Sequence, residues 1–195
     1  MFLLSFPIIV EADSILKIWL GTVPKYATIF VQLTLFIGLV ESLRMPMNTA
    51  IHSTGKIKKF QIYEGGASLL ILPLALLFLY LGFSPVSVFV VQLAMFIIIQ
   101  IIRILIVCPA IGMEKKKYLL DVVLPIFKVV MLPFFVIPLL KCYIQFGNMY
   151  INLCFYIFTT VILSILCIYY IGLDRMMRDK VLCEIKKKIK GKIFR

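Results

Sequence analysis

Residues 86–108 read VSVFVVQLAMFIIIQIIRILIVC, and this stretch decides the class of fold. It holds one charged residue, Arg103, and no glycine or proline that would interrupt a helix. At a rise of about 1.5 Å per residue, a helix of this length extends for about 35 Å, and the hydrocarbon core of a bilayer is about 30 Å thick. The stretch therefore predicts a helix that crosses a membrane.

Four more apolar stretches of similar length predict further spans. Together the predicted spans are residues 27–49, 60–82, 86–108, 119–140 and 149–171. Apolar residues make up 63% of the 195-residue chain, against about 45–50% in an ordinary soluble domain. This excess excludes a water-soluble enzyme and a nucleic-acid partner, although the formal net charge is +12. We expect an all-α fold, a polytopic transmembrane helical bundle whose five helices fall within residues 26–172.

Two segments flank the predicted bundle. Residues 1–10 are apolar but too short to cross a bilayer, so residues 1–25 are interpreted as the end of a truncated span followed by an external connection. In residues 173–195, Met177, Val181, Ile185 and Ile189 recur every four residues, with lysines around them. This pattern predicts a basic amphipathic cytoplasmic tail that binds anionic lipids.

Lysine and arginine residues are concentrated in alternate connections between the predicted spans. Fifteen of them lie at residues 50–59, at residues 109–118 and after residue 171, whereas three lie in the other connections. The positive-inside rule places the lysine-rich side, and with it the C-terminus, in the cytoplasm.

Charged side chains inside the predicted spans are the candidates for a substrate-binding cavity. Glu41 and Arg44 lie three residues apart and share a helix face, so they can form an ion pair. Arg103 follows Gln100 by three residues near the inner end of its span. Lys128 is the deepest, about 14 Å from the inner surface, where a charge costs about 2.5–3.5 kcal/mol unless it faces protein or water. Arg44, Lys128, Arg103 and Glu41 are therefore predicted to line a cavity.

Each of these charges also has a structural interpretation, which the sequence leaves open. Arg103 and Lys128 can extend their long side chains to the membrane interface. Glu41 and Arg44 can pair without touching any ligand. Prolines in the fourth span favour the cavity interpretation, because proline frees backbone carbonyls and kinked helices often line transport pathways. These prolines are Pro125, Pro133 and Pro138.

The sequence carries no pattern typical of metal, nucleotide or covalent chemistry. His52 is the only histidine, and the five cysteines show no CxxC spacing. The Thr-Gly-Lys at residues 54–56 lacks the upstream glycine of a nucleotide-binding loop. We therefore expect a protein that is not an enzyme and that binds no metal and no other cofactor.

Short stretches in a fixed order resemble a known family. They are FPII at residues 6–9, IWLG at 18–21, YA at 26–27, SLRMP at 42–46, AIHSTGKI at 50–57, FQ at 60–61 and GLDR at 172–175. In this order and spacing they resemble the C-terminal lobe of bacterial polysaccharide flippases, the Wzx-type O-antigen transporters of the MOP superfamily. The resemblance covers nearly the whole chain and about the second half of a family member.

This resemblance implies about half of a two-lobed MOP-type transporter in the bacterial cell (inner) membrane. Such a transporter moves a lipid-linked oligosaccharide, the repeat unit of O-antigen, capsule or exopolysaccharide, from the inner to the outer leaflet. Arg44, Lys128 and Arg103 would then contact a diphosphate or an acidic sugar. The partner would be the missing N-terminal lobe or a second copy, and the chain alone would not transport. Two alternatives stay open: a fragment of a drug/cation antiporter of the same superfamily, and a small structural subunit of a membrane complex.

Overall fold

The computed structural model describes residues 1–55, 57–143, 148–172 and 178, and its regular elements in these ranges are all helices. The predicted all-α class, a polytopic helical bundle, is therefore confirmed. In chain order the elements are α1 (Phe2–Val10), α2 (Ala12–Leu20), α3 (Ala27–Ser42), α4 (Arg44–Ser53), α5 (Ile57–Leu69), α6 (Ile71–Tyr80), α7 (Val86–Ala110), α8 (Lys115–Tyr118), the π-helical turn η1 (Leu119–Val123), α9 (Leu124–Tyr143), α10 (Met149–Cys167) and the π-helical turn η2 (Ile168–Gly172).

Five helical stretches within the described residues are long and apolar enough to cross a membrane. They are Ala27–Ser53, Ile57–Tyr80, Val86–Ala110, Lys115–Lys141 and Met149–Gly172. The first joins α3 to α4 and the second joins α5 to α6, each with only a slight irregularity at the junction. The chain is thus a multi-pass membrane protein by the length and composition of its helices.

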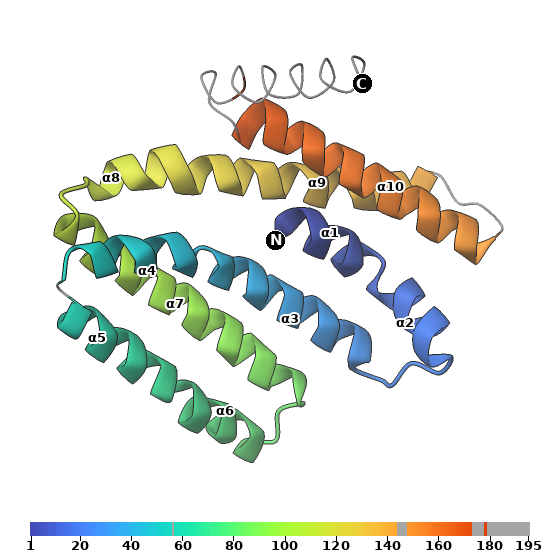
Figure 1. Ribbon diagram of the computed structural model, residues 1–195. Coiled ribbons are helices and arrows are strands. Elements are labelled where there is room, and N and C mark those ends of the chain that lie inside the picture. The colour runs from blue at the N-terminus through green and yellow to red at the C-terminus, as the bar shows by residue number, and fades with distance from the viewer. Residues whose placement is uncertain (56, 144–147, 173–177, 179–195) are drawn as a thin grey trace, which may run out of the picture.

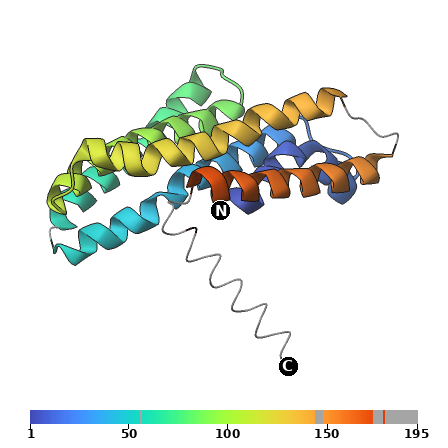
Figure 2. The same ribbon diagram turned by 90° about the horizontal axis from the view of Figure 1, so that it is seen from above.

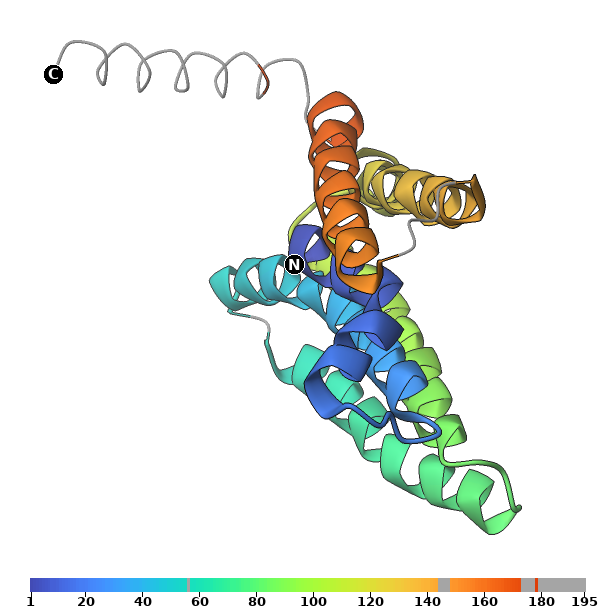
Figure 3. The same cartoon turned by 90° about the vertical axis from the view of Figure 1, so that its right-hand side faces the viewer.

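The long helices run side by side in two groups (Figures 1 and 2). In the first group α7 packs against α3 and α4 and against the α5 and α6 pair. The second group consists of α9 and α10, which pack against each other. Helix α1 contacts both α3 and α10, and Figure 3 shows it between the two groups. Helix α1 is therefore one of the contacts that join the two groups; at the lysine-rich end Tyr118 joins them as well, since it packs with Met47 and Val107.

The burial pattern is that of a protein surrounded by lipid. Large apolar side chains cover the outside, whereas several buried side chains are small or polar, which lets helix backbones approach closely without a hydrophobic driving force. The most exposed large apolar side chains of the spans include Leu69, Leu72 and Phe158. Buried polar side chains include Gln100, Arg103, Thr160 and Ser164.

The fourth span is irregular where it enters the bundle. Pro125 has no N–H for the carbonyl of Asp121, and the backbone there forms the π-helical turn η1 instead of a regular α-helical turn. Further along, α9 continues through Pro133 and Pro138. The proline nearest the lysine-rich surface thus coincides with the change in helix geometry.

Residues 1–25 contain more helix than the sequence predicts. The expected external connection holds α2, which is separated from α1 by a single residue, Glu11. The predicted tail, residues 173–195, lies outside the described residues apart from Arg178. The guanidinium of Arg178 lies 5.8 Å from the centre of the Tyr169 ring.

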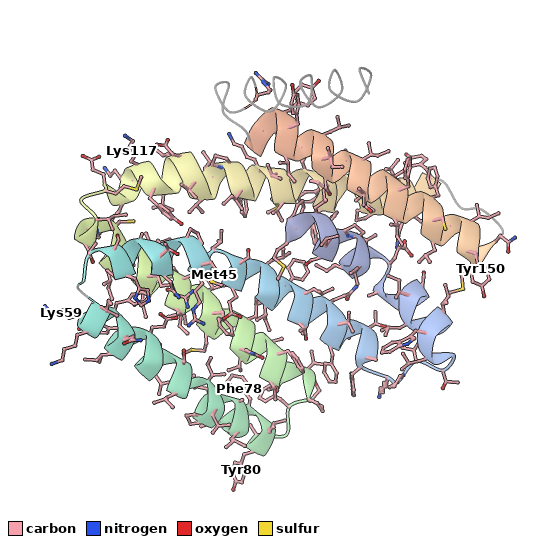
Figure 4. All side chains as sticks on the ribbon, viewed as in Figure 1. Met45, Lys59, Phe78, Tyr80, Lys117 and Tyr150 are labelled. Carbon is pink, nitrogen blue, oxygen red and sulfur yellow. The ribbon has the colours of Figure 1, made fainter. Side chains whose placement is uncertain are left out.

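The two ends of the bundle differ in their side chains. Figure 4 shows Lys59 and Lys117 at one end, which we call the lysine-rich end, and Tyr80 and Tyr150 at the other, the lysine-poor end. Because successive spans run in opposite directions, the connections after α4 and after α7 both fall at the lysine-rich end (Figure 1). The alternation of charge in the sequence therefore has a direct counterpart in space.

We expect the lysine-rich end to face the cytoplasm. A cysteine placed at the lysine-poor end by Asn148→Cys, in a chain without its five native cysteines, should react with a membrane-impermeant maleimide added to intact cells. A cysteine placed by Lys116→Cys should react only after the membrane is opened. The reverse pattern would contradict the orientation that the positive-inside rule predicts.

Candidate functional site

Five polar side chains from four helices meet inside the first group of helices; we call them the charged cluster. They are Glu41 of α3, Arg44 of α4, Glu64 of α5, and Gln100 and Arg103 of α7. Glu64 is the centre of the cluster, since its Oε1 accepts a hydrogen bond from Arg103 Nη2 at 2.5 Å and lies 3.2 Å from Arg44 Nε in a second ion pair. Arg44 Nη1 also donates to Glu41 Oε1 at 3.0 Å. Two arginines and two carboxylates thus balance in charge.

Arg103 is the most deeply buried charge of the cluster. Its side chain is 2% exposed, and Nη1 donates to Gln100 Oε1 at 3.0 Å. Gln100 in turn donates through Nε2 to the sulfur of Met47 at 3.5 Å. A buried guanidinium is stable only when it is paired and hydrogen-bonded. The arrangement around Arg103 therefore fixes α7 to α5 at this depth.

The cluster lies well inside the membrane-spanning part. Glu64 is seven residues from the start of its span at Ile57, and Arg103 is seven residues from the end of its span at Ala110. At about 1.5 Å per residue, both lie about 10 Å from the lysine-rich end. Charged groups at such a depth are rare and usually face protein or a water-filled cavity.

A polar pocket of about 460 Å³ opens beside the cluster, between α4 and α5. Its lining residues are Arg44, Asn48, His52, Phe60, Gln61, Glu64, Gly65 and Ser68. Within the described part of the chain, the buried side-chain oxygen of Asn48 has no hydrogen-bond partner. The pocket thus offers amide, hydroxyl, imidazole, carboxylate and guanidinium groups around one space.

A second pocket, of about 580 Å³, shares two residues with the polar pocket. It is lined by Met1, Gly38, Glu41, Ser42, Arg44, Met45 and Asn48. Arg44 and Asn48 belong to both pockets, and the Arg44 side chain is 40% exposed. Arg44 is therefore the charged side chain of the cluster that a ligand in either pocket can reach.

The structure brings together three of the four residues proposed from the sequence. Glu41, Arg44 and Arg103 belong to the charged cluster, in which Glu41 and Arg44 form the pair that their spacing predicts. Lys128 is exposed on α9, in the second group of helices, and lines neither of the two pockets at the cluster. Its assignment to a cavity stays a prediction.

Sequence reasoning missed Glu64, although a signal was present. Glu64 is the only carboxylate within residues 60–82, and a lone charge inside a span needs a partner. Its partner Arg103 is 39 residues away on another span, so no local spacing connects the two residues. Gly65 and Gly66 follow Glu64 directly, and Gly65 lies in the wall of the polar pocket.

A second ion pair joins α1 to α9 near the lysine-poor end. Lys141 Nζ lies 2.7 Å from Glu11 Oε1, donates to the Val10 carbonyl at 2.9 Å, and lies 5.4 Å from the centre of the Tyr156 ring. Gln32 Nε2 donates to the carbonyl of Ile9 at 3.0 Å. These contacts satisfy backbone oxygens at the break between α1 and α2, so this pair has a structural explanation.

The described residues also bear on the presence of a metal site. No group of three or more histidine, cysteine, aspartate and glutamate side chains there could hold a metal ion. Comparison of the chain with protein-family models, with curated proteins and with solved structures finds no match.

Proposed function

We propose that this chain is part of a flippase that moves a lipid-linked oligosaccharide from the inner to the outer leaflet of the bacterial cell membrane. The observation that carries the proposal is the polar pocket, whose lining groups lie within membrane-spanning helices. Such groups are costly in a bilayer, and intramembrane polar sites usually serve a substrate pathway.

The chemistry of the polar pocket suits a sugar. A sugar presents hydroxyls that both donate and accept hydrogen bonds, and the pocket supplies both kinds of partner through Asn48, Gln61 and Ser68.

The arginines divide two tasks within this proposal. Arg44 is half-exposed and adjoins both pockets, so its guanidinium binds a diphosphate or an acidic sugar by charge-assisted hydrogen bonds. Arg103 is buried and bonded to Glu64 and Gln100. Arg103 acts as a positioning residue. It holds the carboxylate of Glu64 in place, and that carboxylate in turn orients the guanidinium of Arg44.

The position of the polar pocket fits the proposed direction of transport. It extends from His52 and Phe60 near the lysine-rich end to Ser68, which lies eleven residues into its span. At about 1.5 Å per residue, Ser68 is about 17 Å deep and therefore near the middle of the bilayer. With the lysine-rich end in the cytoplasm, a headgroup loaded from the inner leaflet enters at His52.

One alternative has an observation of its own. The carboxylates of Glu41 and Glu64 line the second pocket and the polar pocket, respectively. Carboxylates inside spans also serve proton or cation exchange, which is the chemistry of a drug/cation antiporter.

Binding of a photoreactive polyprenyl-diphosphate oligosaccharide to the chain in lipid nanodiscs tests the proposal. We expect cross-linking at α4 or α5, and about tenfold weaker binding by Asn48→Leu and Gln61→Leu, since each loses a hydrogen bond to the sugar. Gln92→Leu is the matched control, because Gln92 belongs to α7 but not to the polar pocket.

The competitors separate the alternatives. An oligosaccharide diphosphate without its lipid should compete with the probe, whereas a lipophilic cation should not. Competition by the cation alone, lost in Glu64→Gln, would support the antiporter. Equal binding by all three leucine variants would contradict a sugar site in the polar pocket.

A further inference from the structure

Helix α2 carries an apolar stripe that is buried in its first part and exposed at its end. Ala12 and Leu16 lie on one side of α2 and are buried against the bundle. Trp19 follows at the next position of the same stripe, three residues after Leu16, yet it is 81% exposed. It is the only tryptophan of the chain. Because the Trp19 ring is large, apolar and not covered by the protein, we expect it to contact something outside the chain.

The other faces of α2 are polar in part. Asp13 and Lys17 form an ion pair at 2.5 Å, four residues apart, and both side chains are more than half exposed. After α2 the chain turns at Gly21, whose φ of 71° favours glycine, and reaches α3 at Ala27. Within this turn Lys25 lies 5.5 Å from the centre of the Tyr26 ring. Cationic and aromatic groups therefore accompany Trp19 at this end of the bundle.

Exposed tyrosines mark the same end on the other spans. Tyr80 ends α6, Tyr143 ends α9 and Tyr150 lies at the start of α10. Their exposed fractions are 92%, 86% and 66%, respectively. Figure 4 shows Tyr80 and Tyr150 at the tips of their helices, away from Lys59 and Lys117. These side chains come from different spans but lie at the same boundary of the bundle.

We propose that α2 is an interfacial helix that lies among phospholipid headgroups at the lysine-poor end, with Trp19 as its membrane anchor. Tryptophan and tyrosine favour the headgroup level because one part of the ring is apolar and the N–H or O–H stays hydrated. Lys25 complements the lipid phosphates in charge. The tyrosines at the span ends continue this aromatic belt around the bundle.

The headgroup region explains the features of α2 better than the hydrocarbon core or a protein partner. The exposed Asp13 and Lys17 pair excludes burial of the whole helix in hydrocarbon, where charges are costly. The belt of tyrosines is distributed over separate spans, whereas a docked protein would cover one patch. This inference is independent of the transported substrate.

The single tryptophan makes the proposal directly testable by fluorescence. The full chain is reconstituted into bilayers of phospholipids brominated at acyl positions 6 and 7 or at positions 11 and 12. We expect the shallow bromines to quench Trp19 more strongly than the deep ones, and aqueous iodide to quench it only in part. In Trp19→Phe the signal should disappear, which assigns it to this residue.

A matched variant calibrates the depth. Phe158 of α10 is 67% exposed and lies nine residues after the start of its span, about 14 Å into the bilayer. The double variant Trp19→Phe with Phe158→Trp should show the opposite order, with the deep bromines more effective. Three results would overturn the proposal: stronger quenching of Trp19 by the deep bromines, quenching by iodide alone, or protection from both, which would show that protein covers the ring.

Discussion

Replacing Glu64 with glutamine is expected to destabilise the bundle by about 3–5 kcal/mol, the range measured when a buried ion pair loses one partner. Arg103, at 2% exposure, would keep its bond to Gln100 but lose its only carboxylate among the described residues. The buried guanidinium would then lack a counter-charge in a medium that solvates it poorly. Unfolding of the purified chain in mixed micelles, with increasing SDS, would measure the loss.

Glu41→Gln is the matched control in the same cluster. Glu41 is 41% exposed and pairs with Arg44, which is 40% exposed. A pair of this exposure contributes about 0–1 kcal/mol, so this variant should unfold close to the wild type. The double variant Glu64→Leu with Arg103→Met removes both charges and should recover most of the stability. Equal costs for Glu64→Gln and Glu41→Gln would contradict the central role of Glu64.

The second large effect is expected on transport. In a bacterial strain whose surface polysaccharide depends on the transporter that contains this chain, Arg44→Leu should reduce export by about 10- to 100-fold. A hydrogen bond to a charged group contributes about 1.5–3 kcal/mol, and each 1.4 kcal/mol corresponds to a factor of ten. Membrane insertion should stay close to normal, because the lost pair with the half-exposed Glu41 contributes only about 0–1 kcal/mol.

Lys128→Leu distinguishes the two interpretations of Lys128. If its exposed face on α9 lines the transport cavity, export should fall as it does in Arg44→Leu, with the protein level unchanged. Lys116→Leu serves as the control, because Lys116 is one of three consecutive lysines at the lysine-rich end. Surface polysaccharide and chain abundance would be measured in the same cells. Undiminished export in both Arg44→Leu and Lys128→Leu would show that these charges are structural only.

The ion pairs show which contacts can be derived from a sequence. Glu41 with Arg44, and Gln100 with Arg103, lie three residues apart within one span, so local helical geometry already brings them together. Glu64 with Arg103, and Glu11 with Lys141, lie 39 and 130 positions apart in different parts of the bundle. Their meeting depends on how helices are rotated and shifted against one another, which spacing within a helix does not specify.

The sequence by itself determined the class of this protein. Five long apolar stretches must form helices in a membrane, because lipid offers no hydrogen-bond partner to an open backbone. The lysines are concentrated in alternate connections and so divide the connections into two sets, from which the positive-inside rule predicts the orientation. Both properties depend on residues close in sequence and on the surrounding medium.

The tertiary structure alone decided where polar groups far apart in the sequence meet. It placed Glu64 between two arginines, formed the polar pocket beside them, and folded α2 where a connection was expected. The apolar surface of a membrane helix is nearly uniform towards lipid, so hydropathy does not reveal which face turns inward. Close packing and the pairing of buried charges select that face, and both arise only when the helices assemble.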